Sequence, residues 1–116
     1  MKIYGIYNCT SFKKALTFFK SKCIEVEEID LKTHSISISD IKTYHELSGL
    51  DIKKFLNTSG KLYRELSLKD KVKDMALSEV YKLLSEQPML IKRPLIAEDD
   101  FVRTGFKLEE YETRWG

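Results

Sequence analysis

Cys9 is the residue of this sequence best placed to do chemistry. It follows the β-prone run KIYGIY and precedes TSFKKALTFFK, where apolar residues recur at helical spacing, so it lies where a strand ends and a helix begins. Backbone N–H groups and the positive end of a helix dipole favour the thiolate there, which is the nucleophilic form of cysteine. Lys13, one helical turn further on, adds positive charge. The alternative is that Cys9 is a half-buried apolar side chain, because free cysteines are among the most buried residues.

The spacing of the two cysteines limits the chemistry that Cys9 can perform. A dithiol motif would place a second cysteine three residues on, but that position holds Phe12. If Cys9 and Cys23 flank one helix, they stand roughly 20 Å apart, which is beyond disulfide reach. A reactive Cys9 is therefore a monothiol, which forms a mixed disulfide that an external thiol resolves.

Arg93 and Pro94 are the second feature with chemical interest. They precede the apolar run LIA, and proline cannot donate to a β ladder, so we expect Pro94 at the entrance of a strand or in a cis turn. Arg93 is either half of a surface ion pair or a contact for an anion or a thiolate, and the sequence leaves both open. Neither His34 nor His45 stands with cysteines or acids at metal-ligand spacing, so no metal site is predicted, and we expect His45 to be an exposed helix residue.

The elements that must position these residues form an α/β pattern. KIYGIY and IEVEEIDL are predicted strands on either side of the helix after Cys9, and such a crossover makes them parallel. Residues 38–87 are predicted to be helices and turns, with Ser39 as an N-cap and Gly49 as a C-cap of the first helix. After Pro88, the extended segments MLI and PLIA, the acidic turn EDD and FVRTGF indicate a hairpin, and KLEEYETRW indicates a last helix.

Length and composition exclude several classes of protein. The chain has 116 residues, 42% of them hydrophobic and 33% charged, which is typical of one globular domain. Its formal charge of +2 is small and its lysines stand beside acids, which argues against direct nucleic-acid binding. It has no apolar run of about 18 residues and no signal-peptide pattern. We therefore expect a cytoplasmic monomer without membrane contact.

Three segments together resemble the arsenate-reductase-related ArsC/Spx/MgsR family. They are YGIYNCTSFKKAL, FLNTSGKLYREL, and LIKRPLI followed by VRTGFKLEEYE, and they cover nearly the whole chain in the family's order. The resemblance implies one thioredoxin-like domain over residues 1–116, with a central mixed four-stranded sheet, flanking helices and a helical insertion at about residues 38–87 between its βαβ and ββα halves. It also implies that Cys9 matches the family's active-site cysteine, and that Arg93 and Pro94 match its arginine and cis-proline.

Departures from the family pattern separate its branches. Arsenate reductases hold the oxyanion with three arginines, because guanidinium is planar and bidentate. Here only Arg93 is in place, while Asn57 stands at the first arginine's position and the third falls near Lys107, which argues against efficient arsenate reduction. Spx-like regulators contact RNA polymerase and sense oxidation through a Cys-x-x-Cys pair, and Phe12 removes that switch.

The small monothiol branch is the one that NCTSFKKA and NTSGKLYREL resemble most. It implies a thiol-dependent reductase without a bound cofactor, whose co-substrate is a low-molecular-weight thiol or a protein thiol. In this branch Cys9 and Arg93 would be catalytic, and the residues that bind substrate or anion would be Lys13, Asn57, Pro94 and Lys107. Two alternatives stay open: an Spx-like regulator that contacts RNA polymerase without the switch, and an inactive protein that only binds a partner.

Overall fold

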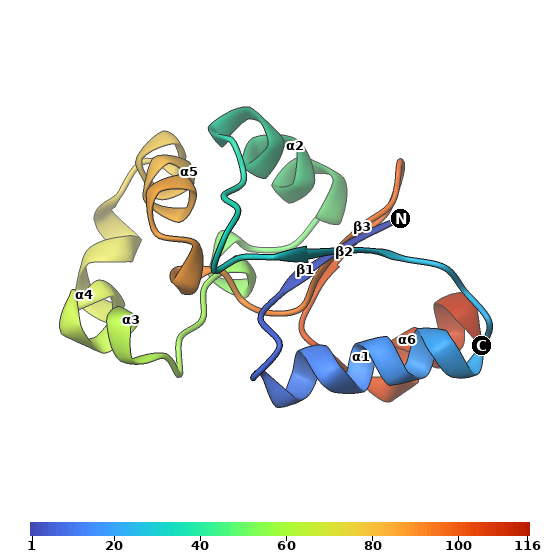
Figure 1. Cartoon of the computed structure of the whole chain (residues 1–116). Helices are drawn as coiled ribbons and strands as arrows, with labels where there is room; N and C mark the ends of the chain where they lie inside the picture. The colour runs from blue at the N-terminus through green and yellow to red at the C-terminus, as the bar shows by residue number, and fades with distance from the viewer.

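The sheet at the centre of the molecule positions everything else. The computed structural model describes all 116 residues, and its four strands lie in the order β2-β1-β3-β4. Helices lie on both sides of the sheet (Figure 1). β1 (Lys2–Gly5) is parallel to β2 (Glu27–Asp30) and antiparallel to β3 (Leu95–Ala97), which pairs antiparallel with β4 (Val102–Thr104). The predicted α/β class with a mixed four-stranded sheet is confirmed.

Two helices cover one face of this sheet. α1 (Thr10–Ser21) is the crossover between β1 and β2, and α6 (Leu108–Trp115) follows β4 and lies beside α1 (Figure 1). Ile3 and Ile96 are fully buried on this face, together with aromatic residues of the two helices, among them Phe12, Phe18, Phe19 and Tyr111. The helices therefore pack on the sheet through an aromatic cluster.

The regular elements between β2 and β3 are all helices, joined by loops, and this part of the chain lies across the other face (Figure 1). It contains α2 (Ile38–Ser48), η1 (Ile52–Phe55), α3 (Lys61–Glu65), α4 (Leu68–Lys71), η2 (Val72–Asp74), α5 (Leu77–Glu86) and η3 (Pro88–Leu90). Because successive strand side chains point to opposite faces, Tyr4 and Leu95 pack toward these helices while their neighbours Ile3 and Ile96 face α1 and α6. No helix combines the length and apolar character needed to cross a bilayer.

Three local predictions need correction. The N-cap of α2 is Ser37, whose hydroxyl accepts the Asp40 N–H at 3.1 Å, and not Ser39, which lies inside the helix. The segment MLI is not extended throughout, because Pro88 begins the 3-10 turn of η3, a position that suits its fixed φ and missing N–H. His45 is half-buried rather than exposed, since it packs edge-on against Phe55 and Tyr81. Gly49 does end α2, in the left-handed conformation with φ 65°.

Candidate functional site

Cys9 is the N-cap residue of α1. Its backbone is extended, with φ −88° and ψ 121°, and its carbonyl accepts the N–H of Lys13 at 3.1 Å. The sulfur makes no capping hydrogen bond and no disulfide, and the side chain is half-buried between the two apolar clusters. The thiol therefore lies at the positive end of a 12-residue helix, among its unpaired N–H groups.

Phe12 and Gly5 fix the position of this helix start. Phe12 is fully buried, and a Cβ on Gly5 would lie 2.7 Å from its Cε1 and nearer to two other ring atoms, so the ring rests on the strand backbone. Tyr7 packs on Phe12 with ring centroids 5.4 Å apart. The hydroxyl of Tyr7 donates to Glu28 at 2.8 Å, which ties the loop before Cys9 to β2, and this hydrogen bond raises the pKa of Tyr7.

Strand register brings Arg93 and Pro94 to the same end of the sheet as Cys9. Leu95 is paired with Tyr4, so the chain that enters β3 from Arg93 runs beside the chain that leaves β1 toward Cys9. The Arg93–Pro94 peptide bond is cis. Pro94 is buried, and its carbonyl accepts the N–H of Gly105 at 2.8 Å. The structure thus brings Cys9, Arg93 and Pro94 to the same end of the sheet.

The guanidinium of Arg93 is held by the protein but retains donor capacity. Its Nη1 donates to the carbonyl of Met89 at 3.1 Å and lies 3.9 Å from the Met89 sulfur. Arg93 forms no ion pair, and its buried Nε has no hydrogen-bond partner. An unpaired buried donor is unfavourable by about 1–3 kcal/mol, so a bound anion that accepted from it would be stabilised.

A short stretch of antiparallel pairing holds Asn57 at this end of the sheet. Leu56 is bridged to Ile91, and the N–H of Asn57 donates to the Leu90 carbonyl at 2.7 Å. Asn57 is therefore held beside the segment that ends in Arg93. Its side-chain amide, however, faces its own loop, since a Cβ on Gly60 would lie 2.6 Å from Asn57 Nδ2.

The two lysines of the predicted site occupy different places. Lys107 is exposed, directly precedes α6, and lies two residues after Gly105, whose N–H contacts Pro94. Lys13 is exposed on α1 and lines a groove between α1 and α6. The fold therefore brings Cys9, Arg93, Pro94, Asn57 and Lys107 to one end of the sheet and directs Lys13 to the adjoining groove.

Met89 is a contact of Arg93 that the sequence reasoning missed. The sequence predicts that the segment MLI is extended, and it gives no contact between Met89 and Arg93. The signal that points to it is Pro88, which favours the first position of a helical turn. In the observed turn the Met89 carbonyl accepts from the Arg93 guanidinium.

Comparisons with known proteins agree with this architecture. The ArsC family model matches residues 4–114, so the chain belongs to the ArsC family. A protein from Bacteroides fragilis described as related to the ArsC family superimposes with a TM-score of 0.92 at 35% identity, covering 97% of this chain and 94% of that one. An arsenate reductase from Vibrio cholerae superimposes with a TM-score of 0.78 at 25% identity, covering 90% of this chain and 89% of that one. The thioredoxin-like fold is thereby confirmed.

Two sequence relatives place the chain within the family. YusI of Bacillus subtilis is 39% identical over 115 residues, which are 99% of this chain and 98% of YusI. The global transcriptional regulator Spx of Bacillus subtilis is 26% identical over 108 residues, which are 93% of this chain and 81% of Spx. This ArsC-family protein is thus related both to arsenate reductases and to Spx regulators.

Proposed function

We propose that this protein is a cytoplasmic monothiol reductase, in which Cys9 exchanges with a disulfide that contains a small thiol. The observation that carries the proposal is the position of Cys9, which is a free N-cap thiol at the positive end of α1, at the sheet end that also holds Arg93. The residue one helical turn from Cys9 is Phe12, which is buried in the core, so no second thiol lies beside Cys9 on this helix. A monothiol cycle with an external thiol fits these features.

The cycle has two exchange steps. The Cys9 thiolate attacks the small-thiol sulfur of a mixed disulfide, so that the S–S bond breaks, the other sulfur leaves as a thiolate and Cys9 carries the small thiol. A second small-thiol molecule, as its thiolate, then attacks that sulfur, which restores the Cys9 thiolate and releases the small-thiol disulfide. Each cycle consumes one free small-thiol molecule, whose sulfur passes to the disulfide level as the substrate sulfur becomes a thiolate, so the exchange balances and no bound cofactor takes part.

In this proposal the residues around Cys9 stabilise its thiolate with positive charge and hold the substrate in place. Arg93, held by the Met89 carbonyl, supplies a fixed positive charge at the same end of the sheet as Cys9, and its buried Nε–H is unpaired. Lys13 and Lys107 add exposed positive charge, and buried Pro94 forms a rigid wall. The amide of Asn57 can donate to a bound anion only after it turns away from its own loop. The set contains one arginine where arsenate reductases would use three, so the proposal does not extend to efficient arsenate reduction.

Turnover of a mixed disulfide tests this function directly. In a Cys23→Ser background, the protein is given glutathione and the mixed disulfide of glutathione with mercaptoethanol, and oxidised glutathione is measured. We expect Cys9→Ser to abolish turnover, because it removes the reacting thiolate. We expect Arg93→Ala to lower the rate about tenfold, because it removes a positive charge that stabilises that thiolate. Equal turnover by the Cys9→Ser variant would overturn the proposal.

A second candidate function is regulatory. It is favoured by the similarity to Spx over 93% of this chain, and it assigns RNA polymerase as the partner, contacted without a dithiol switch. A regulator would capture RNA polymerase, and Cys9→Ser would leave that interaction intact. A protein that only binds some other partner would show neither turnover nor polymerase capture.

A further inference from the structure

We propose that Met89 is a site of reversible oxidation, and that its sulfoxide lowers the reactivity of Cys9 by accepting a hydrogen bond from the guanidinium of Arg93. This proposal rests on the function above, because it requires Arg93 to stabilise the Cys9 thiolate. It adds a modification site and a redox control that lies outside the two cysteines.

Met89 provides both hydrogen-bond contacts of the Arg93 guanidinium. Its carbonyl accepts from Nη1 at 3.1 Å, and its sulfur lies 3.9 Å from the same nitrogen. A thioether sulfur is only a weak acceptor, so the second contact contributes little to holding the guanidinium. The Nε of this guanidinium is buried and has no partner. A stronger acceptor in place of the sulfur would therefore lie beside a donor group whose hydrogen bonds the folded protein leaves incomplete.

The side chain of Met89 is half-buried and open to small oxidants from solvent. It lines a depression of about 580 Å³ between the loop of residues 31–35 and η3. On its other side it packs against the larger apolar cluster of the core. An oxygen added to the sulfur is unfavourable against that apolar surface, and Arg93 is the polar side chain that already contacts the sulfur.

Oxidation converts this sulfur from a weak acceptor into part of a strong one. The sulfur attacks one oxygen of hydrogen peroxide, the O–O bond breaks, an S–O bond forms and water leaves, so the sulfur loses the two electrons that the peroxide gains. The sulfoxide oxygen carries partial negative charge and accepts from N–H donors. Because the sulfur is already 3.9 Å from Nη1, rotation of the side chain brings the new oxygen within hydrogen-bond distance of the guanidinium.

The sulfoxide oxygen then weakens the effect of Arg93 on Cys9. It occupies one guanidinium donor, and its partial negative charge offsets part of the positive potential that stabilises the thiolate. Arg93 keeps its full charge, so the effect is smaller than that of removing the residue. We expect the rate of Cys9 alkylation at neutral pH to fall about threefold. Methionine sulfoxide is reduced enzymatically, which makes the change reversible.

Oxidation of the protein with both thiols protected tests this site. Methyl methanethiosulfonate caps Cys9 and Cys23 as disulfides, hydrogen peroxide oxidises the methionines, and dithiothreitol then restores both thiols without reducing the sulfoxide. Peptide mass spectrometry measures the oxidation of Met89, and iodoacetamide gives the ratio of the Cys9 rate to the Cys23 rate. We expect this ratio to fall about threefold, and methionine sulfoxide reductase to restore it.

Two variants and a matched control separate this site from general oxidative damage. Met89→Leu keeps the carbonyl that holds Arg93 but has no sulfur there, so peroxide should leave its rate ratio unchanged. Met75→Leu is the control, because Met75 is also half-buried against the same cluster but forms no hydrogen bond with Arg93, and its ratio should fall as in the wild-type protein. In Arg93→Ala the sulfoxide has no guanidinium to contact, so oxidation should not lower the ratio further.

The outcomes that overturn the Met89 site differ from those that overturn the function. An equal fall in Met89→Leu, a threefold fall in Arg93→Ala, or an unchanged ratio in wild-type protein with oxidised Met89 contradicts the proposal. So does a Met89 that stays reduced while Met75 is oxidised. All four results leave the reactivity of Cys9 intact. Equal alkylation of Cys9 and Cys23 before oxidation overturns the monothiol function, and the Met89 proposal falls with it.

Discussion

The ring of Phe12 rests on the backbone of Gly5. Phe12 is fully buried, and any Cβ at position 5 would enter the contact distance of its ring atoms. This contact sets the angle at which the chain leaves β1 and starts α1, and Cys9 stands between the two residues. Position 12, where a dithiol motif would have its second cysteine, is therefore part of the core of this protein.

Gly5→Ala should lower the free energy of unfolding by about 1–3 kcal/mol, because the added methyl group overpacks the site. In a Phe12→Leu background the same substitution should have a smaller effect, since the smaller side chain leaves room for a methyl group. Urea denaturation of the four proteins measures this coupling. Strictly additive effects of the two changes would show that the ring and the glycine do not constrain each other.

His45 joins α2 to the remainder of the helical insertion. Its Nδ1 lies 2.6 Å from the hydroxyl of Tyr81, and its Nε2 lies 2.9 Å from the carbonyl of Leu50, so a neutral ring protonated on Nε2 donates to the carbonyl and accepts from the tyrosine. His45→Ala should lower stability by about 2 kcal/mol, because both partners lose their hydrogen bonds. Tyr81→Phe should then add little in the His45→Ala background. A full additional loss in the double variant would mean that the two side chains act independently.

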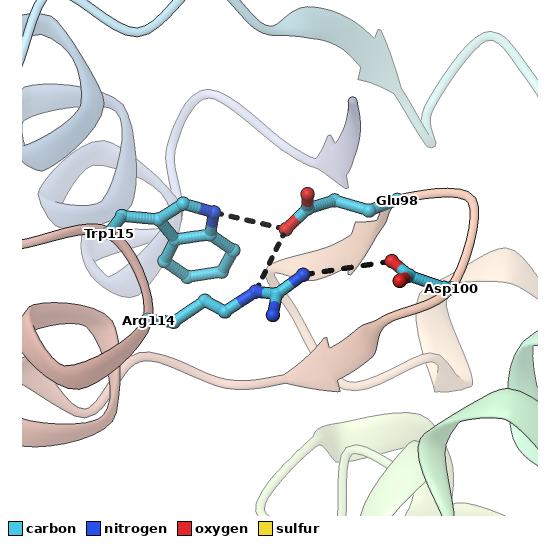
Figure 2. A network of polar contacts seen from close by, with 4 residues as sticks. All are labelled: Glu98, Asp100, Arg114 and Trp115. Carbon is cyan, nitrogen blue, oxygen red and sulfur yellow. Dashed lines mark hydrogen bonds and ion pairs between the residues drawn. The ribbon is translucent and has the colours of Figure 1, made fainter.

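Glu98 and Asp100 both contact α6 but should contribute unequally (Figure 2). Glu98 accepts from Trp115 Nε1 at 3.0 Å and from Arg114 Nε at 3.4 Å, with its side chain 25% exposed. Asp100 meets Arg114 at 3.6 Å with its side chain 86% exposed. We expect Glu98→Ala to lower stability by about 1–2 kcal/mol and Asp100→Ala by less than about 0.5 kcal/mol. Tryptophan fluorescence in urea reports both, and equal losses would contradict the unequal roles.

Tyr4 and Tyr111 should make the fold sensitive to alkali. Burial raises the pKa of both phenols in the folded protein, and their hydroxyls contact Tyr44 and the Gly105 carbonyl at 2.7 and 2.9 Å. The unfolded chain loses these protons near pH 10, so the stability they contribute is fully present below that pH and falls as pH rises above it.

Absorbance at 295 nm, followed together with circular dichroism, tests this tyrosine prediction. Part of the signal of the six tyrosines should appear only as the protein unfolds. Tyr111→Phe should reduce that late part. Complete ionisation near pH 10 in a protein that stays folded would contradict it.

The sequence predicts the sheet and the position of Cys9 because both depend on local patterns. Alternation and helical spacing place the end of β1 and the start of α1 on either side of Cys9, and the family resemblance supplies the topology. The sequence does not predict the environment of Arg93. Its contact with Met89 depends on a 3-10 turn that a run of apolar letters does not distinguish from a strand.

The sequence does not predict the groove beside Lys13 either, because two helices that are far apart in the chain form it. The prediction that His45 is exposed is wrong for a related reason. Its neighbours in sequence are polar, while the aromatic residues that bury it, Phe55 and Tyr81, come from other elements.

The rate of iodoacetamide alkylation at Cys9 at neutral pH, measured beside that of exposed Cys23 in the same molecule, tests the central claim most directly. We predict that Cys9 is alkylated about tenfold faster than Cys23, because the positive end of α1 and the charge of Arg93 favour its thiolate. Arg93→Ala should bring the Cys9 rate closer to that of Cys23. Equal rates for the two cysteines in the wild-type protein would contradict a reactive Cys9.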